Sequence, residues 1–136
     1  MDLTEEVRNG YLISSEMKKV WSVQMELLKK LLFVCDKYNL KIWADSGTLI
    51  GTVREKGFIP WDDDIDMIMM RNDYDKLISI SEKEFNDPYF LQSAYSESKY
   101  PRGHAQLRMR GTAAILPNDM DQSFDQSIFL DIFVYD

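Results

Sequence analysis

The sequence WADSGTLIGTVREKGFIPWDDDIDMIMMR, residues 43–71, is the stretch from which the fold can be predicted. It contains a small-residue turn at residues 45–48 and four aspartates within residues 62–66, which lead directly into an apolar run. Side chains alternate between the two faces of a β-strand, so Asp64 and Asp66 are expected on one face. The apolar run predicts a strand buried on both faces. Because neighbouring carboxylates at the edge of a core repel each other, we expect a divalent cation between them.

The composition indicates one folded domain. The chain has 136 residues, 45% hydrophobic and 29% charged, which is typical of a globular protein. A formal net charge of −7 disfavours a nucleic-acid partner, because phosphate backbones require clusters of Lys and Arg. We expect no membrane span and no signal peptide, because no apolar run has the necessary length. The single cysteine, Cys35, fits a reducing compartment, and we therefore expect a cytoplasmic protein.

A long helix is predicted near the N-terminus. Ser14 or Ser15 is a suitable N-cap, and Asn39 is a suitable residue to end the helix. Only Gln24 interrupts its apolar stripe, a pattern typical of a helix that packs on a core. The stripe consists of Met17, Val20, Trp21, Gln24, Leu27, Leu28, Leu31, Val34, Cys35 and Tyr38.

Two further helices are expected. The first is short and covers residues 48–56, after the small-residue turn. The second covers residues 74–85, with Asn72 or Asp73 as its N-cap, and residues 86–88 break it.

Several segments are typical of strands. They are residues 40–44, 89–93, 105–109, 113–116 and 127–134. Asp131 is the one charge within the last of these, and a lone buried carboxylate costs several kcal/mol unless something compensates it. Placed beside Asp64 and Asp66, it would complete a three-carboxylate site for Mg²⁺ or Mn²⁺. Residues 1–10 show no pattern from which we predict structure.

Four segments, in this order, resemble the signature of the LicD/fukutin family. They are residues 47–51 (GTLIG) with Arg54, residues 58–66 (FIPWDDDID), residues 71–74 (RNDY) and residues 130–133 (LDIF). The family transfers phosphocholine or related phospho-polyol groups from a CDP-activated donor to glycans. The resemblance implies an α/β (α+β) nucleotidyltransferase-like fold, with a small mixed sheet, helices packed on one side of it, and the site at the edge of the sheet.

The resemblance also implies a site. Asp64, Asp66 and Asp131 would be the catalytic residues and would bind Mg²⁺ or Mn²⁺. Gly47 would let the backbone approach a phosphate, and Thr48 would add a hydroxyl. The residues expected to contact substrate are Gly47, Thr48, Arg54, Trp61, Gln106 and Arg108.

Other side chains near this site leave alternatives open. Arg54 is expected beside either the donor phosphate or the aspartates. Trp43 and Trp61 are expected to flank the site, either as ordinary core residues or as a cage for a quaternary ammonium group. His104, the only histidine, is predicted to be a surface residue of a Gly-His loop rather than a catalyst.

The predicted function is metal-dependent transfer of phosphocholine, or a similar phospho-alcohol, from a CDP-alcohol donor to a glycan acceptor. Transfer of a nucleoside monophosphate from an NTP to a small hydroxylated acceptor is an alternative that uses the same residues. Members of the family are longer, so residues 1–136 are expected to form one domain without a C-terminal acceptor-binding portion. A truncated, non-catalytic module is the third possibility.

Overall fold

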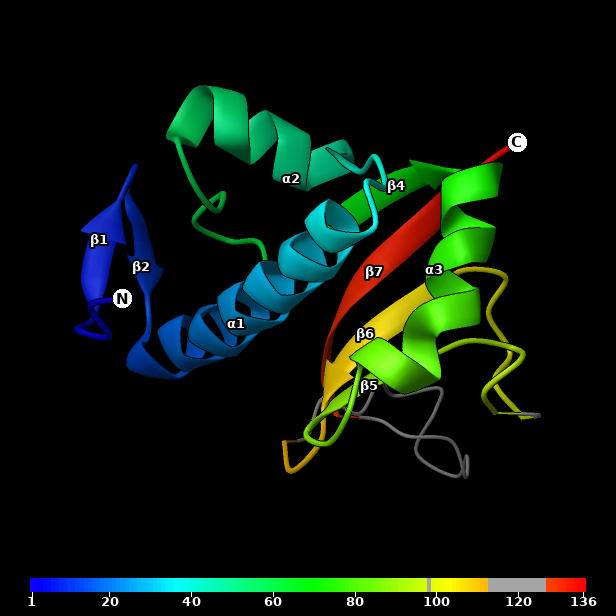
Figure 1. The fold of residues 1–136 in the computed structure, drawn as a ribbon. Helices are drawn as coiled ribbons and strands as arrows, with labels where there is room; N and C mark the ends of the chain where they lie inside the picture. Colours follow the sequence, from blue (N-terminus) through cyan, green and yellow to red (C-terminus); the bar gives the residue numbers. More distant parts are fainter. Residues whose placement is uncertain (98, 113–126) are drawn as a thin grey trace.

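A five-stranded mixed sheet forms the centre of the computed structural model, which describes residues 1–97, 99–112 and 127–136 (Figure 1). Its strand order is β3-β4-β7-β6-β5. The strands are β3 Trp43–Ala44, β4 Asp66–Met70, β5 Tyr89–Gln92, β6 Ala105–Met109 and β7 Ile128–Tyr135. β4 and β7 are parallel, and the other neighbouring pairs are antiparallel. The predicted mixed sheet is therefore confirmed.

The long helix α1, Ser15–Lys37, forms as predicted. The Ser14 side chain accepts a hydrogen bond from the Met17 backbone N–H at 3.1 Å, which satisfies one of the free amides at the start of the helix. Asn39 follows the helix in the left-handed conformation, with φ 55°, as expected of a residue that ends a helix.

The second helix begins earlier than predicted. It consists of α2, Ser46–Ile50, and of a π-helical turn η1, Gly51–Glu55, that continues it. A Cβ atom on Gly51 would lie 2.4 Å from the carbonyl oxygen of Gly57, so the helix and the following loop approach too closely for any side chain at position 51.

Helix α3, Arg71–Glu84, starts directly after β4, and its N-cap is Met70. The prediction that Asn72 or Asp73 caps this helix is wrong. The Asp73 carboxylate instead accepts a hydrogen bond from the Lys41 backbone N–H at 3.0 Å, so it holds the segment that enters β3.

The N-terminal residues, for which the sequence pattern predicted no structure, form a hairpin. It pairs β1, Glu6–Arg8, with β2, Tyr11–Ile13. Asn9 and Gly10 form its turn with φ of 52° and 76°, and Asn-Gly is the dipeptide that favours such two-residue turns. An ion pair of 2.7 Å between Lys18 and Glu6 joins the hairpin to α1.

The predicted strands have mixed outcomes. Those at residues 89–93, 105–109 and 127–134 are confirmed as β5, β6 and β7, with ends that shift by no more than one residue. The strand predicted at residues 40–44 is reduced to Trp43–Ala44. The strand predicted at residues 113–116 lies outside the described residues.

The two faces of the sheet differ in chemistry. The apolar side chains of β4, β6 and β7 meet those of α1 and α3 in one core cluster, and Figure 1 shows both helices on the same side of the sheet. Five of the residues that alternate with this set carry polar groups on the opposite face. These polar residues are Asp66, Gln92, Gln106, Arg108 and Asp131. The sheet therefore presents these polar groups on the face that α1 and α3 do not cover.

Candidate metal centre

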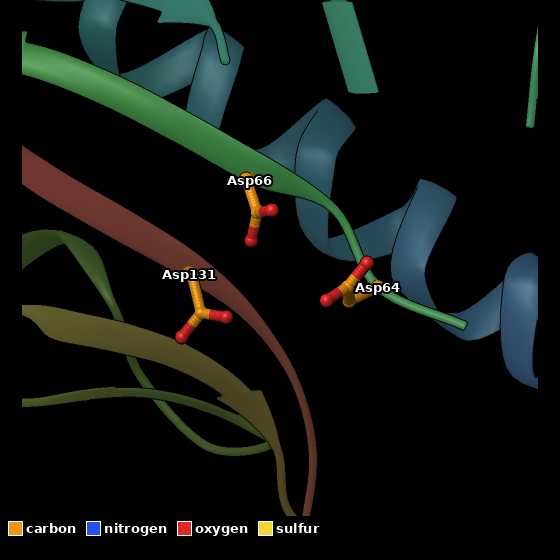
Figure 2. A group of neighbouring side chains, drawn as sticks. All are labelled: Asp64, Asp66 and Asp131. Carbon is orange, nitrogen blue, oxygen red and sulfur yellow. The ribbon is translucent and has the colours of Figure 1, made fainter. Parts of the chain in front are cut away.

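Three carboxylates, two from neighbouring strands and one from the segment that enters β4, converge at one point of the sheet. One oxygen from each of Asp64, Asp66 and Asp131 lies within 4.8 Å of the others. Figure 2 shows Asp64 in the segment that enters β4, Asp66 at the start of β4, and Asp131 on β7. Asp66 and Asp131 are partners in the parallel register, which places their side chains next to each other on one face. The structure thus brings together the three acids expected from the sequence.

Backbone hydrogen bonds fix the start of β4. The Asp66 N–H donates to Thr48 Oγ1 at 2.8 Å, and the Asp66 carbonyl accepts from the Asp45 N–H at 2.9 Å. On the other side, the Asp131 N–H donates to the Ile65 carbonyl at 2.9 Å. The first turn of α2 with its N-cap Asp45, and strand β7, therefore hold the backbone at Ile65 and Asp66 from opposite sides.

Helix α1 holds the acidic loop in place. Trp21 Nε1 donates to the Asp62 carbonyl at 2.8 Å, and Gln24 Nε2 donates to the Asp63 carbonyl at 2.7 Å. Gln24 is buried, so the one polar residue within the apolar stripe of α1 satisfies a backbone carbonyl that would otherwise lose its hydrogen bond to water. This pair of contacts sets the position from which Asp64 reaches the centre.

Burial and repulsion act together on the carboxyl groups. Burial raises the pKa of Asp64, and the neighbouring charges of Asp62, Asp63 and Asp131 raise it further. The pKa of Asp66 is raised to about 7, mainly by burial and further by the neighbouring charges of Asp64 and Asp131. A bound cation would oppose these shifts, because it favours the ionised form of each carboxyl.

Two side chains from the β6 region bind the same oxygen of Asp131. Gln106 Nε2 donates to Asp131 Oδ1 at 2.8 Å, and His104 Nε2 contacts that oxygen at 2.8 Å. The His104 ring packs at 4.4 Å against Phe133, and Tyr100 donates to the His104 carbonyl at 2.8 Å. Asp131 Oδ1 is thus held by the side chains of His104 and Gln106.

The prediction that His104 is a surface residue is wrong. Its side chain is only 22% exposed because it contacts Asp131 and the ring of Phe133. A signal was present in the sequence. His104 lies two residues before Gln106, and residues spaced by two share a face wherever the strand pattern extends that far.

Arg108 does not face a substrate, in contrast to the prediction. Its side chain is buried, and the guanidinium donates to Gln92 Oε1 at 2.6 Å, to Gln106 Oε1 at 2.6 Å and to the Ser127 carbonyl. By occupying Gln106 Oε1, Arg108 directs the amide nitrogen of Gln106 towards Asp131. Gln106, also expected to contact substrate, is buried and supports the carboxylate instead.

Three other predicted side chains lie in different surroundings. Arg54 is exposed and pairs with the adjacent Glu55 at 3.0 Å, so the structure does not place it on the aspartates. Trp61 is half exposed and packs edge-on against Tyr11, with ring centroids 6.0 Å apart. Trp43 lies beside the C-terminal half of β4. The structure therefore gives no common cage formed by the two tryptophans.

A cavity of about 380 Å³ lies next to the carboxylates, between α1, the α2 turn and the loop that leads to β4. Gly47 and Thr48, two of the residues predicted to contact substrate, line it, and Asp64 borders both the cavity and the carboxylate cluster. The carboxyl group of Asp62 lies so close to Gly47 that a Cβ atom on this glycine would be 2.6 Å from Asp62 Oδ2.

Within the described ranges 1–97, 99–112 and 127–136, no helix combines the length and apolar character needed to cross a bilayer.

Comparisons with known proteins point to one family. The family model described as "LicD/FKTN/FKRP, nucleotidyltransferase domain" matches residues 39–135. Lipopolysaccharide cholinephosphotransferase LicD of Haemophilus influenzae is 32% identical over 118 residues, which cover 84% of this chain and 42% of that protein. An uncharacterized protein of Rickettsia prowazekii is 38% identical over 102 residues, which cover 75% of this chain and 35% of that protein. The chain thus spans less than half the length of these relatives.

Proposed function

Since this chain belongs to the LicD family of nucleotidyltransferase domains, we propose that it transfers phosphocholine, or a similar phospho-alcohol, from a CDP-activated donor to a glycan. The observation that carries the proposal is the convergence of Asp64, Asp66 and Asp131 beside a cavity large enough for part of such a donor. The activity named for the Haemophilus influenzae relative supports phosphocholine as the transferred group and a lipopolysaccharide precursor as the acceptor class.

We also propose that the three carboxylates hold Mg²⁺ or Mn²⁺. The donor set consists of carboxylate oxygens, which suit these hard cations, whereas zinc sites generally contain Cys or His. When bound, the ion would supply positive charge to the phosphate oxygens as negative charge develops on them. The raised pKa values of Asp64 and Asp66 support the proposal, because the cluster is unfavourable without a counter-charge.

The protein groups have separate roles in this reaction. Gly47 leaves room for the Asp62 carboxylate to lie against the backbone, and Thr48 holds the start of β4 through the Asp66 N–H. His104 and Gln106 bind Oδ1 of Asp131 and so orient its second oxygen. Asp131 would then help to hold the ion on the acceptor side of the site, and it would take the proton from the attacking acceptor hydroxyl. We expect the reaction to take place in the cytoplasm.

Incubation with a panel of possible donors tests the proposed reaction. The protein would be incubated with Mg²⁺ or Mn²⁺, a glycan acceptor, and a panel of CDP-alcohols and NTPs, and the products would be identified by ³¹P NMR. Release of CMP from CDP-choline, lost in Asp131→Asn, is the expected result. Release of pyrophosphate from an NTP would instead support nucleotidyl transfer, in which a different phosphorus is attacked.

A longer form provides the control for chain length. If this chain turns over no donor while a form of the relatives' full length does, the chain is a non-catalytic module on its own. If neither form acts on any donor, the proposed function is wrong.

A further inference from the structure

We propose that the cavity beside the carboxylates binds a positively charged headgroup of the donor alcohol, such as trimethylammonium, and that Asp62 provides its counter-charge. The inference rests on the proposed function, because it assigns one part of the donor to a place in the site. It differs from the cage expected from the sequence, which required Trp43 and Trp61.

The cavity is mainly apolar. Two α1 residues form one wall, and the segment that leads to β4 forms the other. The apolar lining side chains are Met25, Leu28, Phe58, Ile59 and Ile65. A trimethylammonium group has no N–H to donate, so apolar and aromatic contacts with a nearby negative charge are the surroundings that suit it.

The Asp62 carboxylate lies at this cavity without a partner among the described residues. Its backbone is engaged on both sides, because its carbonyl accepts from Trp21 Nε1 and its N–H donates to the Ile59 carbonyl at 2.9 Å. The carboxylate itself rests against Gly47, in the space that a side chain at position 47 would fill. A half-buried anion without a hydrogen bond is unfavourable, and an organic cation in the cavity would offset this cost.

The other polar groups of the lining do not suit the nucleobase of the donor. The Thr52 hydroxyl donates to the Thr48 carbonyl at 2.8 Å, and Thr48 Oγ1 accepts from the Asp66 N–H. A pyrimidine base needs several hydrogen-bond partners, whereas the described lining offers mainly apolar surface and the carboxylates of Asp62 and Asp64. Lys56 also lines the cavity, but its side chain is exposed, so solvent screens its charge.

One donor molecule can reach both the cavity and the carboxylate cluster. Asp64 borders the cavity and also belongs to the carboxylate cluster. A donor with its phosphates at the cluster would therefore place the adjacent headgroup in the cavity and extend its nucleoside elsewhere.

Calorimetric titration with Mg²⁺ tests this assignment on three ligands. They are CDP-choline, the CDP ester of 3,3-dimethylbutanol, and CDP. The dimethylbutanol ester has carbon in place of the quaternary nitrogen, so it keeps the shape of choline and loses the charge. We expect wild type to bind CDP-choline about tenfold more tightly than the neutral ester, as for a partly desolvated charge pair with aromatic contact.

Two variants separate the role of Asp62 from the effect of losing any one negative charge of the acidic loop. Asp62→Asn should reduce the preference for CDP-choline to less than about twofold while leaving CDP affinity unchanged. Asp63→Asn is the matched control, because Asp63 is exposed and does not line the cavity, and it should keep the preference. Thermal melting checks that both variants fold.

Each other outcome overturns the assignment. Equal affinity of wild type for the two esters excludes the headgroup site, and this comparison needs no variant. A preference that survives in Asp62→Asn excludes Asp62 as the counter-charge. Weaker binding of CDP itself in Asp62→Asn would place the nucleotide in the cavity. These results leave the proposed phosphotransfer intact, whereas failure of all three ligands to bind contradicts both proposals.

Discussion

The carboxyl group of Asp66 illustrates, at the scale of single residues, how burial and neighbouring charge shape the centre. Its pKa is raised from 3.8 to about 7, first by burial and then by Asp64 and Asp131. Without a cation, and at a pH between 3.8 and about 7, the Asp66 carboxyl therefore binds more protons in the folded protein than in the unfolded chain. Folding stability from Asp66 falls as pH rises through this window, and the loss is complete above about pH 7.

This linkage predicts a pH-dependent melting temperature. In EDTA, the melting temperature of wild type should fall more steeply from pH 5 to pH 8 than that of Asp66→Asn, which cannot ionise. Scanning fluorimetry at closely spaced pH values measures both slopes. Parallel slopes would show that Asp66 does not titrate in this range.

His104 provides a second prediction at the residue scale. His104→Ala removes one of the two groups on Asp131 Oδ1, so Mg²⁺ or Mn²⁺ affinity should fall about 10- to 100-fold. His104→Gln can place an amide N–H near the same oxygen and should restore most of the affinity. Calorimetric metal titration distinguishes the two variants. Equal affinity of His104→Ala and wild type would contradict this positioning role.

At the scale of elements, the centre depends on how helices hold a loop. Side chains of α1 bind the carbonyls of Asp62 and Asp63, and the Thr48 hydroxyl of α2 binds the start of β4. The loop between η1 and β4 then folds back on the start of η1. There Gly51, the first residue of η1, lies against the backbone of Gly57. Small changes in these contacts would therefore move Asp64.

Gly51 allows a test of this close approach. Gly51→Ala should destabilise the fold by about 1–3 kcal/mol, because its Cβ would meet a backbone carbonyl that cannot rotate away. Gly57→Ala is the control, since a Cβ there meets no atom within 4 Å, and its effect should stay within about 0.5 kcal/mol. Urea unfolding measures both changes. Similar stabilities of the two variants would contradict the close packing at Gly51.

At the scale of the whole molecule, the sheet separates stability from chemistry. One face supports the apolar core with α1 and α3, while the other carries the polar groups of β4, β6 and β7. The three carboxylates come from segments far apart in sequence, so a cation bound by all of them would link these segments. Such a cation stabilises the native protein as a whole, because the unfolded chain lacks the arrangement.

Melting with and without metal tests this global effect. A hundredfold excess of Mg²⁺ or Mn²⁺ over its dissociation constant should stabilise wild type by about 2.7 kcal/mol. Asp131→Asn removes one repelling charge and one ligand, so its melting temperature in EDTA should equal or exceed that of wild type, and most of the metal-induced increase should disappear. If wild type shows no metal-dependent increase, or the variant keeps all of it, the three-aspartate site is wrong.

The sequence alone determined the elements whose signals are local. The apolar stripe and Ser14 predict α1, and the alternation within residues 105–109 predicts β6. The pairing of Asp64 with Asp66 on one face and the lone charge of Asp131 in an apolar run predict the acidic centre. Each signal depends on side-chain periodicity or on one capping group, so neighbours in the chain are sufficient to specify it.

Only the tertiary structure decided which partner each polar group has. The parallel register of β4 and β7 places Asp66 beside Asp131, and β6 brings Gln106 and Arg108 to this position, with His104 just before the strand. Sequence patterns do not show whether a side chain such as Arg108 faces a ligand or a buried carbonyl. That choice depends on contacts between segments distant in sequence, because a buried donor takes whichever acceptor the packed strands bring within hydrogen-bond distance.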